Sequence, residues 1–471
     1  MADLSLPAGG IAGAETADLA HAAAQRDVAA RLERLPLTRT QTKARIVVGT
    51  ATFFDGYDSL VLGLVMPVLV TQWHLSREDT GFLLSGTFLG QLIGALLFPY
   101  VAERWGRLRA ATYSVWVVGL FGLACAGAWS YASLTVARVI QGIGIGGEIP
   151  VAATYINEIA HAKVRGRFFL MYEAAFAVGY PVATLLGVLL IPHYGWEIMF
   201  LIGALPALVA AVMRRMLPES PRWLASKGRQ DEAEAIVSKL EHEAEAKLGT
   251  ALPRPDPSVA PPPAARRTNL FELFTPTYRM RTLVVWSIWG FSFFVTQALN
   301  SWLPTIYRQE LHLSIQQALY FTLATHALSV FAAIAAALYI DRIGRRIWIG
   351  SALLFGSLAM GVLAYLGGKD PISLMVCATI SQFALSSVSV SIYVFTAELY
   401  PTRMRALGTG MGSTVRNIFA TLSPTMVALM LTNFGLPGVF TMLAISPLIP
   451  AFMVLAFGTE TKGRVLEEIS P

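Results

Sequence analysis

The sequence has few charged residues and almost no cysteine. Only 14% of its 471 residues are charged and 55% are hydrophobic, whereas a soluble domain usually carries about 25% charged residues. The two cysteines, Cys125 and Cys377, lie inside apolar runs, so no disulfide framework is expected. A Gly-rich phosphate loop, a Cys/His metal spacing and a nucleophile motif are also missing from the sequence. We therefore expect neither an enzyme nor an ATP-driven pump, and no cofactor or metal.

Long apolar runs occupy most of the chain. A helix that crosses a membrane needs about 20 mainly apolar residues. No apolar core with a small-residue cleavage site precedes the first run, so we expect no cleavable signal peptide. The sequence predicts an all-α membrane protein with twelve spans, at about 45–70, 79–101, 110–129, 131–156, 168–192, 196–213, 281–304, 316–340, 347–367, 371–395, 405–432 and 436–458.

Basic residues gather in alternate short loops. These loops are 103-ERWGRLR-109, 163-KVRGR-167, 341-DRIGRR-346 and 403-RMR-405, while the intervening loops hold little beyond Arg77, Arg308 and Lys369. Because short basic loops stay in the cytoplasm, both termini are expected there, as in a bacterial inner membrane. The net charge of +6 then reflects orientation in the lipid bilayer, and nucleic acid is not an expected partner.

The chain divides into two similar halves. We expect a cytoplasmic tail at 1–44, six spans at 45–213, a cytoplasmic segment with an amphipathic helix and a Pro-rich linker at 214–280, six spans at 281–458, and a tail at 459–471. Glu158 precedes Arg165 by seven residues, and Glu398 precedes Arg405 by seven, at an offset of about 240 residues. Repeated halves of this kind are a transporter architecture with the substrate site between them.

Three signatures resemble the major facilitator superfamily over essentially the full length. The pattern acid–Arg–x–Gly–Arg recurs at 103–107 and 341–345, span four carries 138-RVIQGIGIGG-147, and 158-EIAHAKVRG-166 and 218-PESPRWL-224 resemble the sugar-porter and organic-ion branches. Pro99 and Ala337 depart from the family pattern, which often has Gly there. The resemblance implies twelve transmembrane helices in two pseudo-symmetric six-helix bundles that work by alternating access.

Two shorter motifs resemble particular branches. The stretch 55-DGYD-58, with Gly63 and Pro67, is similar to the aromatic acid:proton symporters, such as 4-hydroxybenzoate and benzoate carriers. The stretch 146-GGEIPVAATYINE-158 is similar to the nicotinate transporters. The resemblance implies a monomeric, proton-coupled importer of a small aromatic carboxylate, with a nicotinate or other organic-acid carrier as the alternative. An organic-cation carrier and a non-transporting membrane sensor are more distant alternatives.

The first span contains two acids, Asp55 and Asp58, three residues apart and therefore on one helix face. Asp55 lies ~15 Å from the start of the span, close to mid-membrane. Inserting an Asp at the centre of a transmembrane helix costs roughly 2.5 to 3.5 kcal/mol, so we expect the two acids to have a function that offsets this cost. We expect proton coupling; the alternative is a buried acid held by Arg138. The family resemblance implies that Arg138 tunes these acids, with a purely structural role as the alternative. Glu148 is expected to relay protons or line the cavity, and otherwise to form an interhelical hydrogen bond.

Arg416, ~16 Å into span eleven, is the expected anchor for the anion, because a guanidinium binds a carboxylate with two hydrogen bonds. The alternative is a structural partner for an acid such as Glu398. His326 is expected to be a packed, hydrogen-bonded imidazole, with a proton relay as the alternative. Further expected substrate-site residues are Tyr57, Glu173, Tyr180, Trp289, Phe293, Gln297, Asn300, Gln382 and Phe383.

The charged loops are expected to form a cytoplasmic gate that bridges helix ends when the protein faces outward. Otherwise they are only orientation charges. The expected gate residues are Glu103, Arg104, Arg107, Glu158, Arg165, Asp341, Arg342, Arg345, Arg346, Glu398 and Arg405.

Overall fold

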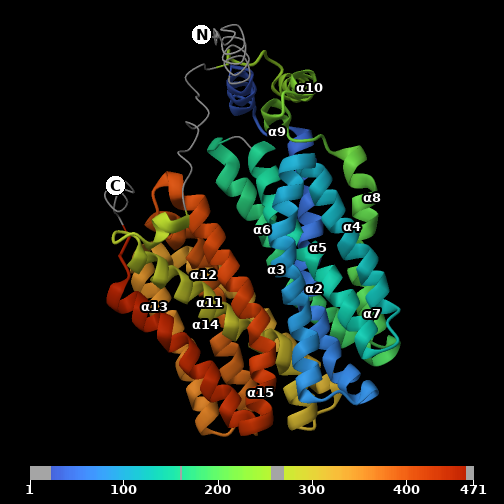
Figure 1. Ribbon diagram of the computed structural model, residues 1–471, viewed down its shortest axis with the longest axis vertical. Helices are drawn as coiled ribbons and strands as arrows, with labels where there is room; N and C mark the ends of the chain where they lie inside the picture. The colour runs from blue at the N-terminus through green and yellow to red at the C-terminus, as the bar shows by residue number, and fades with distance from the viewer. Residues whose placement is uncertain (1–22, 160–161, 256–269, 463–471) are drawn as a thin grey trace, which may run out of the picture.

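The structure is a computed structural model, and it describes residues 23–159, 162–255 and 270–462. The side chains of residues 162–174, 177, 330, 333, 337, 402, 403 and 406 lie outside this description. Every regular element in the described ranges is a helix (Figure 1).

The first half contains α2 (Arg39–Trp73), α3 (Arg77–Trp105), α4 (Arg107–Ala126), α5 (Tyr131–Ile159), α6 (Ala162–Tyr194), α7 (Glu197–Gly203) and α8 (Pro206–Met216). The central segment contains α9 (Pro221–Ser226), α10 (Gln230–Leu248) and the 3-10 turn η1 (Leu270–Phe274). The second half contains α11 (Arg279–Thr305), the π-helical turn η2 (Ile306–Glu310), α12 (Ile315–Ile343), α13 (Arg345–Tyr365), α14 (Pro371–Leu399) and α15 (Thr402–Phe457).

Twelve membrane crossings follow from these helices. Ten helical stretches in the described residues are long and apolar enough to span a bilayer, with α7 and α8 together forming one of them. The 33-residue helix α6 adds another. The continuous helix α15 contains a break at Gly435, where φ is 64°, so it supplies two crossings and brings the total to twelve. The expected all-α fold is confirmed.

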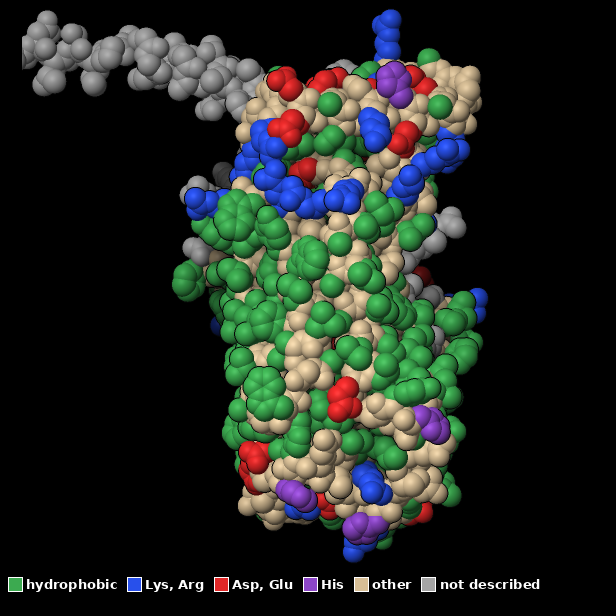
Figure 2. Space-filling model, turned by 90° about the vertical axis from the view of Figure 1, so that its right-hand side faces the viewer, with side chains coloured by type: hydrophobic (Ala, Val, Ile, Leu, Met, Phe, Trp, Pro, Cys, Tyr) green, Lys and Arg blue, Asp and Glu red, His purple; other side chains and the backbone are tan. Residues whose placement is uncertain are grey.

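The helices form two bundles, α2–α8 and α11–α15, which lie side by side in Figure 1. They contact each other through α3 with α15, α2 with α11, and α6 with α12. The helix at residues 23–33, α9 and α10 lie at one end of the molecule. We call this the basic end, because Figure 2 shows a belt of Lys and Arg side chains there, and we call the opposite one the far end.

The surface between the two ends is apolar. Large side chains such as Leu96, Phe331, Phe355 and Phe452 are exposed on it. Figure 2 shows hydrophobic side chains covering the face of the first half below the basic belt. A contiguous apolar band of this extent is too costly to leave in water, so it marks the surface that lipid covers.

A small helical module sits on the basic end of the first half. A helix at residues 23–33 packs on α9 and α10 through Val28, Leu32, Trp223, Val237 and Leu240. Within this module, Arg31 bonds both Glu234 and Glu241, and Arg34 bonds Glu241 at 2.5 Å. The indole of Trp223 donates to the carbonyl oxygen of Glu103, which attaches the module to α3.

Candidate functional site

Asp58 and Arg138 form a buried ion pair between α2 and α5. Nη1 of Arg138 lies 3.1 Å and 3.2 Å from the two carboxylate oxygens of Asp58, and the side chains are 1% or less exposed. Arg138 also donates to Oε1 of Gln141 at 2.7 Å and to Oγ1 of Thr87 at 3.1 Å. Through these contacts Arg138 joins Asp58 of α2 to α5 and to Thr87 of α3, inside the first half.

Asp55 and Glu148 form a second buried acid pair between the same two helices. Asp55 is 2% exposed and Glu148 is 1% exposed. The two carboxyl groups lie within hydrogen-bonding reach of each other. The hydroxyl of Thr52 donates to Oε1 of Glu148 at 3.1 Å. The two acids of the 55–58 motif therefore have different partners.

A glycine allows α6 to pack closely against this part of α2. A Cβ placed on Gly56 would collide with the backbone oxygen of Phe176. Tyr57, expected in the substrate site, is instead fully buried in the first half, where its hydroxyl donates to the carbonyl oxygen of Met199 at 2.9 Å. The side chain of Glu173 lies outside the described residues.

Arg416 lies in an aromatic environment in the second half. Its guanidinium carbon is 5.2 Å from the centre of the Phe293 ring, and that ring stacks on Trp289 with centroids 5.8 Å apart. Nε and Nη2 of Arg416 both donate to Oδ1 of Asn417, at 3.1 Å and 3.0 Å. Across the interface, Tyr180 of α6 is close enough to interact electrostatically with Arg416.

An amide and imidazole network lies near this cluster. Oδ1 of Asn300 is 3.0 Å from Nε2 of Gln382 and 3.2 Å from Nε2 of His326. Nδ1 of His326 is 3.0 Å from Oγ1 of Thr184, so the network crosses from the second half to the first. Nδ2 of Asn300 and Oε1 of Gln382 are buried without a partner among the described residues. These two groups are free to hydrogen-bond a ligand.

Among the described residues, the remaining expected substrate residues make no hydrogen bond to Arg416 or to the Asn300 network. Gln297 donates to the hydroxyl of Ser301 at 3.0 Å, and Phe383 is half-buried. Within the described part of the chain, no hydrogen bond or ion pair joins Arg416 to Asp55 or Asp58. In this conformation the buried acids of the first half and Arg416 of the second half therefore belong to two separate sets of side chains. Thr184 is a residue that the sequence pattern did not single out.

The expected gate residues form two matching clusters, one within each half. Arg107 pairs with Glu103 at 2.8 Å and Glu158 at 3.2 Å, and Arg345 pairs with Asp341 at 2.8 Å and Glu398 at 3.2 Å. These pairs join helices of the same half in this conformation. Their role as a gate that bridges helix ends in the outward-facing state stays a prediction.

The other gate candidates make weaker or local contacts. Arg104 lies 3.4 Å from the hydroxyl of Tyr100, Arg405 donates to the carbonyl oxygen of Ala397, and Arg346 donates to that of Leu455. The backbone oxygen of Arg342 accepts from Lys462. The side chain of Arg165 lies outside the described residues.

Each gate cluster contains two residues that sequence reasoning missed. Glu219 accepts from the backbone of Leu108 while Ser220 bonds Glu158, and Glu460 accepts from the backbone of Arg345 while Thr461 bonds Glu398. Glu460 and Thr461 follow Glu219 and Ser220 by 241 residues. The offset of about 240, applied to 218-PES-220, would have found them.

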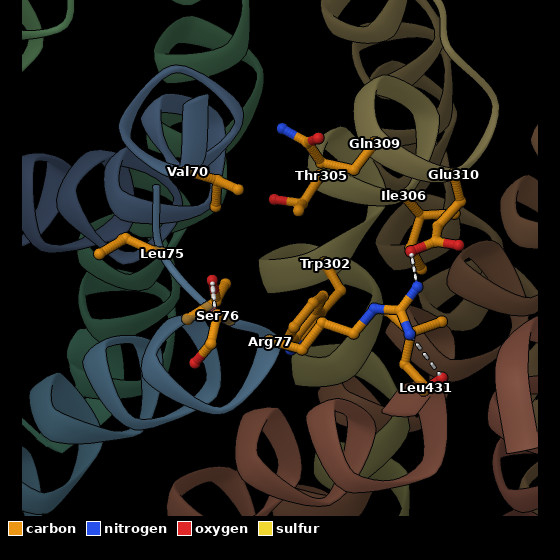
Figure 3. Close-up of a pocket in the computed structure, with 11 residues that line it drawn as sticks. Val70, Leu75, Ser76, Arg77, Trp302, Thr305, Ile306, Gln309, Glu310 and Leu431 are labelled. Atoms are coloured by element: carbon orange, nitrogen blue, oxygen red, sulfur yellow. Dashed lines mark hydrogen bonds and ion pairs between the residues drawn. The ribbon is translucent and has the colours of Figure 1, made fainter. Parts of the chain in front are cut away.

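The far end is closed by contacts between the halves. Nη2 of Arg77 pairs with Oε1 of Glu310 at 2.7 Å, and its Nη1 donates to the carbonyl oxygen of Leu431 (Figure 3). The hydroxyl oxygens of Ser85 and Thr425 are hydrogen-bonded at 2.8 Å, and the carboxylate of Glu78 accepts a hydrogen bond from the hydroxyl of Thr432. A cavity of about 250 Å³ remains beside these contacts.

These features define a polytopic membrane transporter built from two repeated bundles around a central polar site. Residues 44–471 match the protein family described as "Sugar (and other) transporter". The chain therefore belongs to this family, which is part of the major facilitator superfamily. Its members are transporters, not enzymes.

Individual relatives agree with this assignment. The chain is 32% identical to the niacin transporter NiaP of Acinetobacter baylyi over 94% of its own length and 99% of the relative. It is 28% identical to the 4-hydroxybenzoate transporter PcaK of the same organism, over 90% and 92%. The partially occluded inward open xylose transporter XylE from E. coli has a TM-score of 0.70, with 20% identity, over 90% of this chain and 99% of that one.

Proposed function

We propose that the protein is a proton-coupled symporter that imports a small aromatic carboxylate, such as a benzoate or hydroxybenzoate. The observation that carries this proposal is the arrangement of charge. Buried acids lie in α2 and α5, and a guanidinium among aromatic rings lies in α15. The acids suit proton binding, and the guanidinium with Phe293 suits a flat organic anion.

Nicotinate is the second candidate substrate. The relative named a niacin transporter, at 32% identity, supports it. The unpartnered Nδ2 of Asn300 could donate to a pyridine nitrogen, and the unpartnered Oε1 of Gln382 could accept from a phenolic hydroxyl. The amide pair is therefore compatible with either ring, while Arg416 holds the carboxylate common to both.

We further propose that the basic end faces the cytoplasm of a bacterial inner membrane and that the protein works as a monomer. The belt of Lys and Arg at that end supports the orientation. With the far end closed through Arg77 and Glu310, the present conformation would then be inward-facing.

Transport would follow alternating access. A proton neutralises the buried acids and the anion binds Arg416 from the outside, which lowers the cost of occluding the charges. The far-end contacts then form, and the basic end opens. The higher cytoplasmic pH favours loss of the proton, after which the substrate leaves. The two states can interconvert because the contacts that distinguish them are individually weak.

Uptake into liposomes tests this proposal. Purified protein is reconstituted, and the initial uptake rate of labelled 4-hydroxybenzoate is measured with unlabelled benzoate, nicotinate, an aliphatic acid and an organic cation as competitors. We expect saturable uptake that the aromatic acids inhibit most. Inhibition by the cation alone would favour an organic-cation carrier, and ligand binding without any flux would favour a membrane sensor.

A further inference from the structure

The Asp55–Glu148 pair has a feature that the Asp58–Arg138 ion pair lacks. Oδ2 of Asp55 and Oε2 of Glu148 are buried, and no donor from the described residues reaches either oxygen. Yet the two carboxyl groups lie within hydrogen-bonding reach of each other. A hydrogen bond between two carboxyl groups requires a proton on one of them, because two carboxylates are both acceptors.

No cation offsets the charge of this pair among the described residues. The charged groups that interact with Asp55 are Glu148 on α5 and Asp58 on α2 itself, both of them acids. Arg138, which lies on α5 with Glu148, is bonded to Asp58 and Gln141. A pair of buried acids without a cation is costly unless it shares a proton.

Three other helices that pack on α2 contribute neutral groups along the length of α2 that holds the pair. Helix α6 contributes Ala175 and Phe176 beside Gly49 and Gly56, and α8 contributes Ala210 beside Ala51. Helix α11 contributes the backbone of Asn300 beside Gly63. The side chain of Glu173 on α6 lies outside the described residues. The proton is therefore the natural counter-ion of the pair.

We propose that the Asp55–Glu148 carboxyl pair carries the coupled proton, and that Asp58 and Arg138 are positioning residues that stay paired. This assignment rests on the proposed proton coupling. One proton from the outer solution binds to the two carboxylates and forms a single O–H···O⁻ hydrogen bond. The same proton later leaves to water at the basic end, and the pair returns to two carboxylates.

Helix α2 connects this pair to the substrate site. Gly63 lies eight residues after Asp55, ~12 Å along the helix. A Cβ on Gly63 would come within 2.7 Å of the backbone oxygen of Asn300, so α2 touches α11 there without a side chain between them. Adding or removing charge at Asp55 and Glu148 thus acts on the helix that contacts the amide network.

Two single variants test the assignment, Asp55→Asn and Glu148→Gln, each made in the full chain and reconstituted in liposomes. We measure the initial uptake rate of labelled 4-hydroxybenzoate with and without an inside-alkaline pH gradient, and exchange of substrate without a gradient. Each variant is expected to lose stimulation by the gradient while exchange persists, since an amide cannot release the proton. Glu232→Gln, at an exposed position of α10, is the control and should keep both the stimulation and the exchange.

A variant that retains stimulation equal to that of the wild type overturns the assignment while leaving proton coupling intact. If the uptake rate of the wild-type protein is the same with and without the pH gradient, the proposed proton coupling is overturned, and the assignment of the proton to this pair is overturned with it. Exchange activity also reports that each variant is folded.

Thr52→Val gives a second test that leaves both acids in place. It removes the hydroxyl that donates to Glu148, so the pH profile of uptake should shift. Thr154→Val on the same α5 helix is the matched control, because the exposed Thr154 hydroxyl bonds only the Pro150 carbonyl oxygen and should leave the profile unchanged. A Thr52→Val profile that coincides with the wild-type profile would overturn the assignment.

Discussion

At the scale of single residues, two acids three positions apart in α2 have different tasks. Asp58 is bonded to a guanidinium, and Asp55 faces another carboxyl group. Neutral replacement of a residue that must stay charged should lower the stability of the fold. Neutral replacement of a residue that is protonated in each transport cycle should leave that stability nearly unchanged.

We expect Asp58→Asn to destabilise the protein by about 3–5 kcal/mol, because it leaves the Arg138 charge buried without its partner. Thermal unfolding in detergent measures this, with Asp55→Asn as the matched comparison expected near the wild type. The double variant Asp58→Asn with Arg138→Gln should recover part of the loss. Equal stability of Asp58→Asn and the wild type would show that the ion pair is not structural.

Arg416 should determine the affinity for the carboxylate. Arg416→Lys replaces a planar fork by a single ammonium, and losing one charge-assisted hydrogen bond costs about 1.5–3 kcal/mol. We therefore expect the KM for 4-hydroxybenzoate uptake to rise roughly ten- to a hundredfold. Arg308→Lys is the control, since Arg308 bonds the Leu313 carbonyl oxygen of its own turn. A KM equal to that of the control would remove Arg416 as the anchor.

The sequence supports some of these pairings and leaves others out. The spacing of Asp55 and Asp58 predicts a common helix face, and the charge cost predicts that both are buried. It cannot tell which acid meets Arg138, because the choice depends on how α5 packs against α2. Arg138 and Glu148 lie ten residues apart on α5, so each reaches a different level of α2. The sequence also does not predict the contact between Thr184 and His326, because these residues are 142 positions apart in the chain.

At the scale of helices, the module on the basic end depends on Glu241. Burial would raise the pKa of the Glu241 carboxyl, but hydrogen bonds and charge from Arg31 and Arg34 outweigh it and hold that pKa below its ordinary value. A carboxyl with a lowered pKa contributes stability above its unfolded value, about 4.3, and this contribution is lost as pH falls through the folded value.

Hydrogen exchange over residues 23–33 should therefore show protection that is steady at neutral pH and weakens below about pH 4, after correction for intrinsic rates. Glu241→Gln should lose much of that protection already at pH 7. Glu232→Gln should not, because Glu232 pairs with Arg229, the residue that immediately precedes α10. Full protection in Glu241→Gln would mean that the apolar contacts of Leu32 and Leu240 alone hold this helix.

The repeat is the element-scale feature that the sequence predicts best. Matching Glu158 to Glu398 at an offset of about 240 anticipates two clusters that the structure contains, around Arg107 and Arg345. In this conformation each arginine pairs within its own bundle, and the expectation that these charges form a gate by bridging helix ends in the outward-facing state stays a prediction. Periodicity predicts which residues are equivalent, but not which of their neighbours lie close enough to bond.

At the scale of the whole molecule, the far-end contacts hold the two halves in the present conformation. Arg77→Ala removes the ion pair with Glu310 and the hydrogen bond to Leu431, worth together roughly 1 kcal/mol because Arg77 is partly exposed. A change of that size should raise the population open at the far end about fivefold.

Labelling of Thr305→Cys in a background without Cys125 and Cys377 reports that opening, because Thr305 lines the far-end cavity (Figure 3). A membrane-impermeant maleimide should react faster when Arg77→Ala is also present. Lys369→Ala, an exposed charge outside the closure, is the control. Equal labelling rates in the two backgrounds would show that Arg77 does not keep the far end closed.

Proton-coupled uptake is the central claim, and its most direct test is the initial rate of labelled 4-hydroxybenzoate entry under an imposed pH gradient. Protein-free liposomes must be measured in parallel, since a neutral aromatic acid crosses lipid and accumulates passively on the alkaline side. We predict a protein-dependent, saturable rate that the inside-alkaline gradient increases. A protein-dependent rate that is the same with and without the gradient would contradict the account.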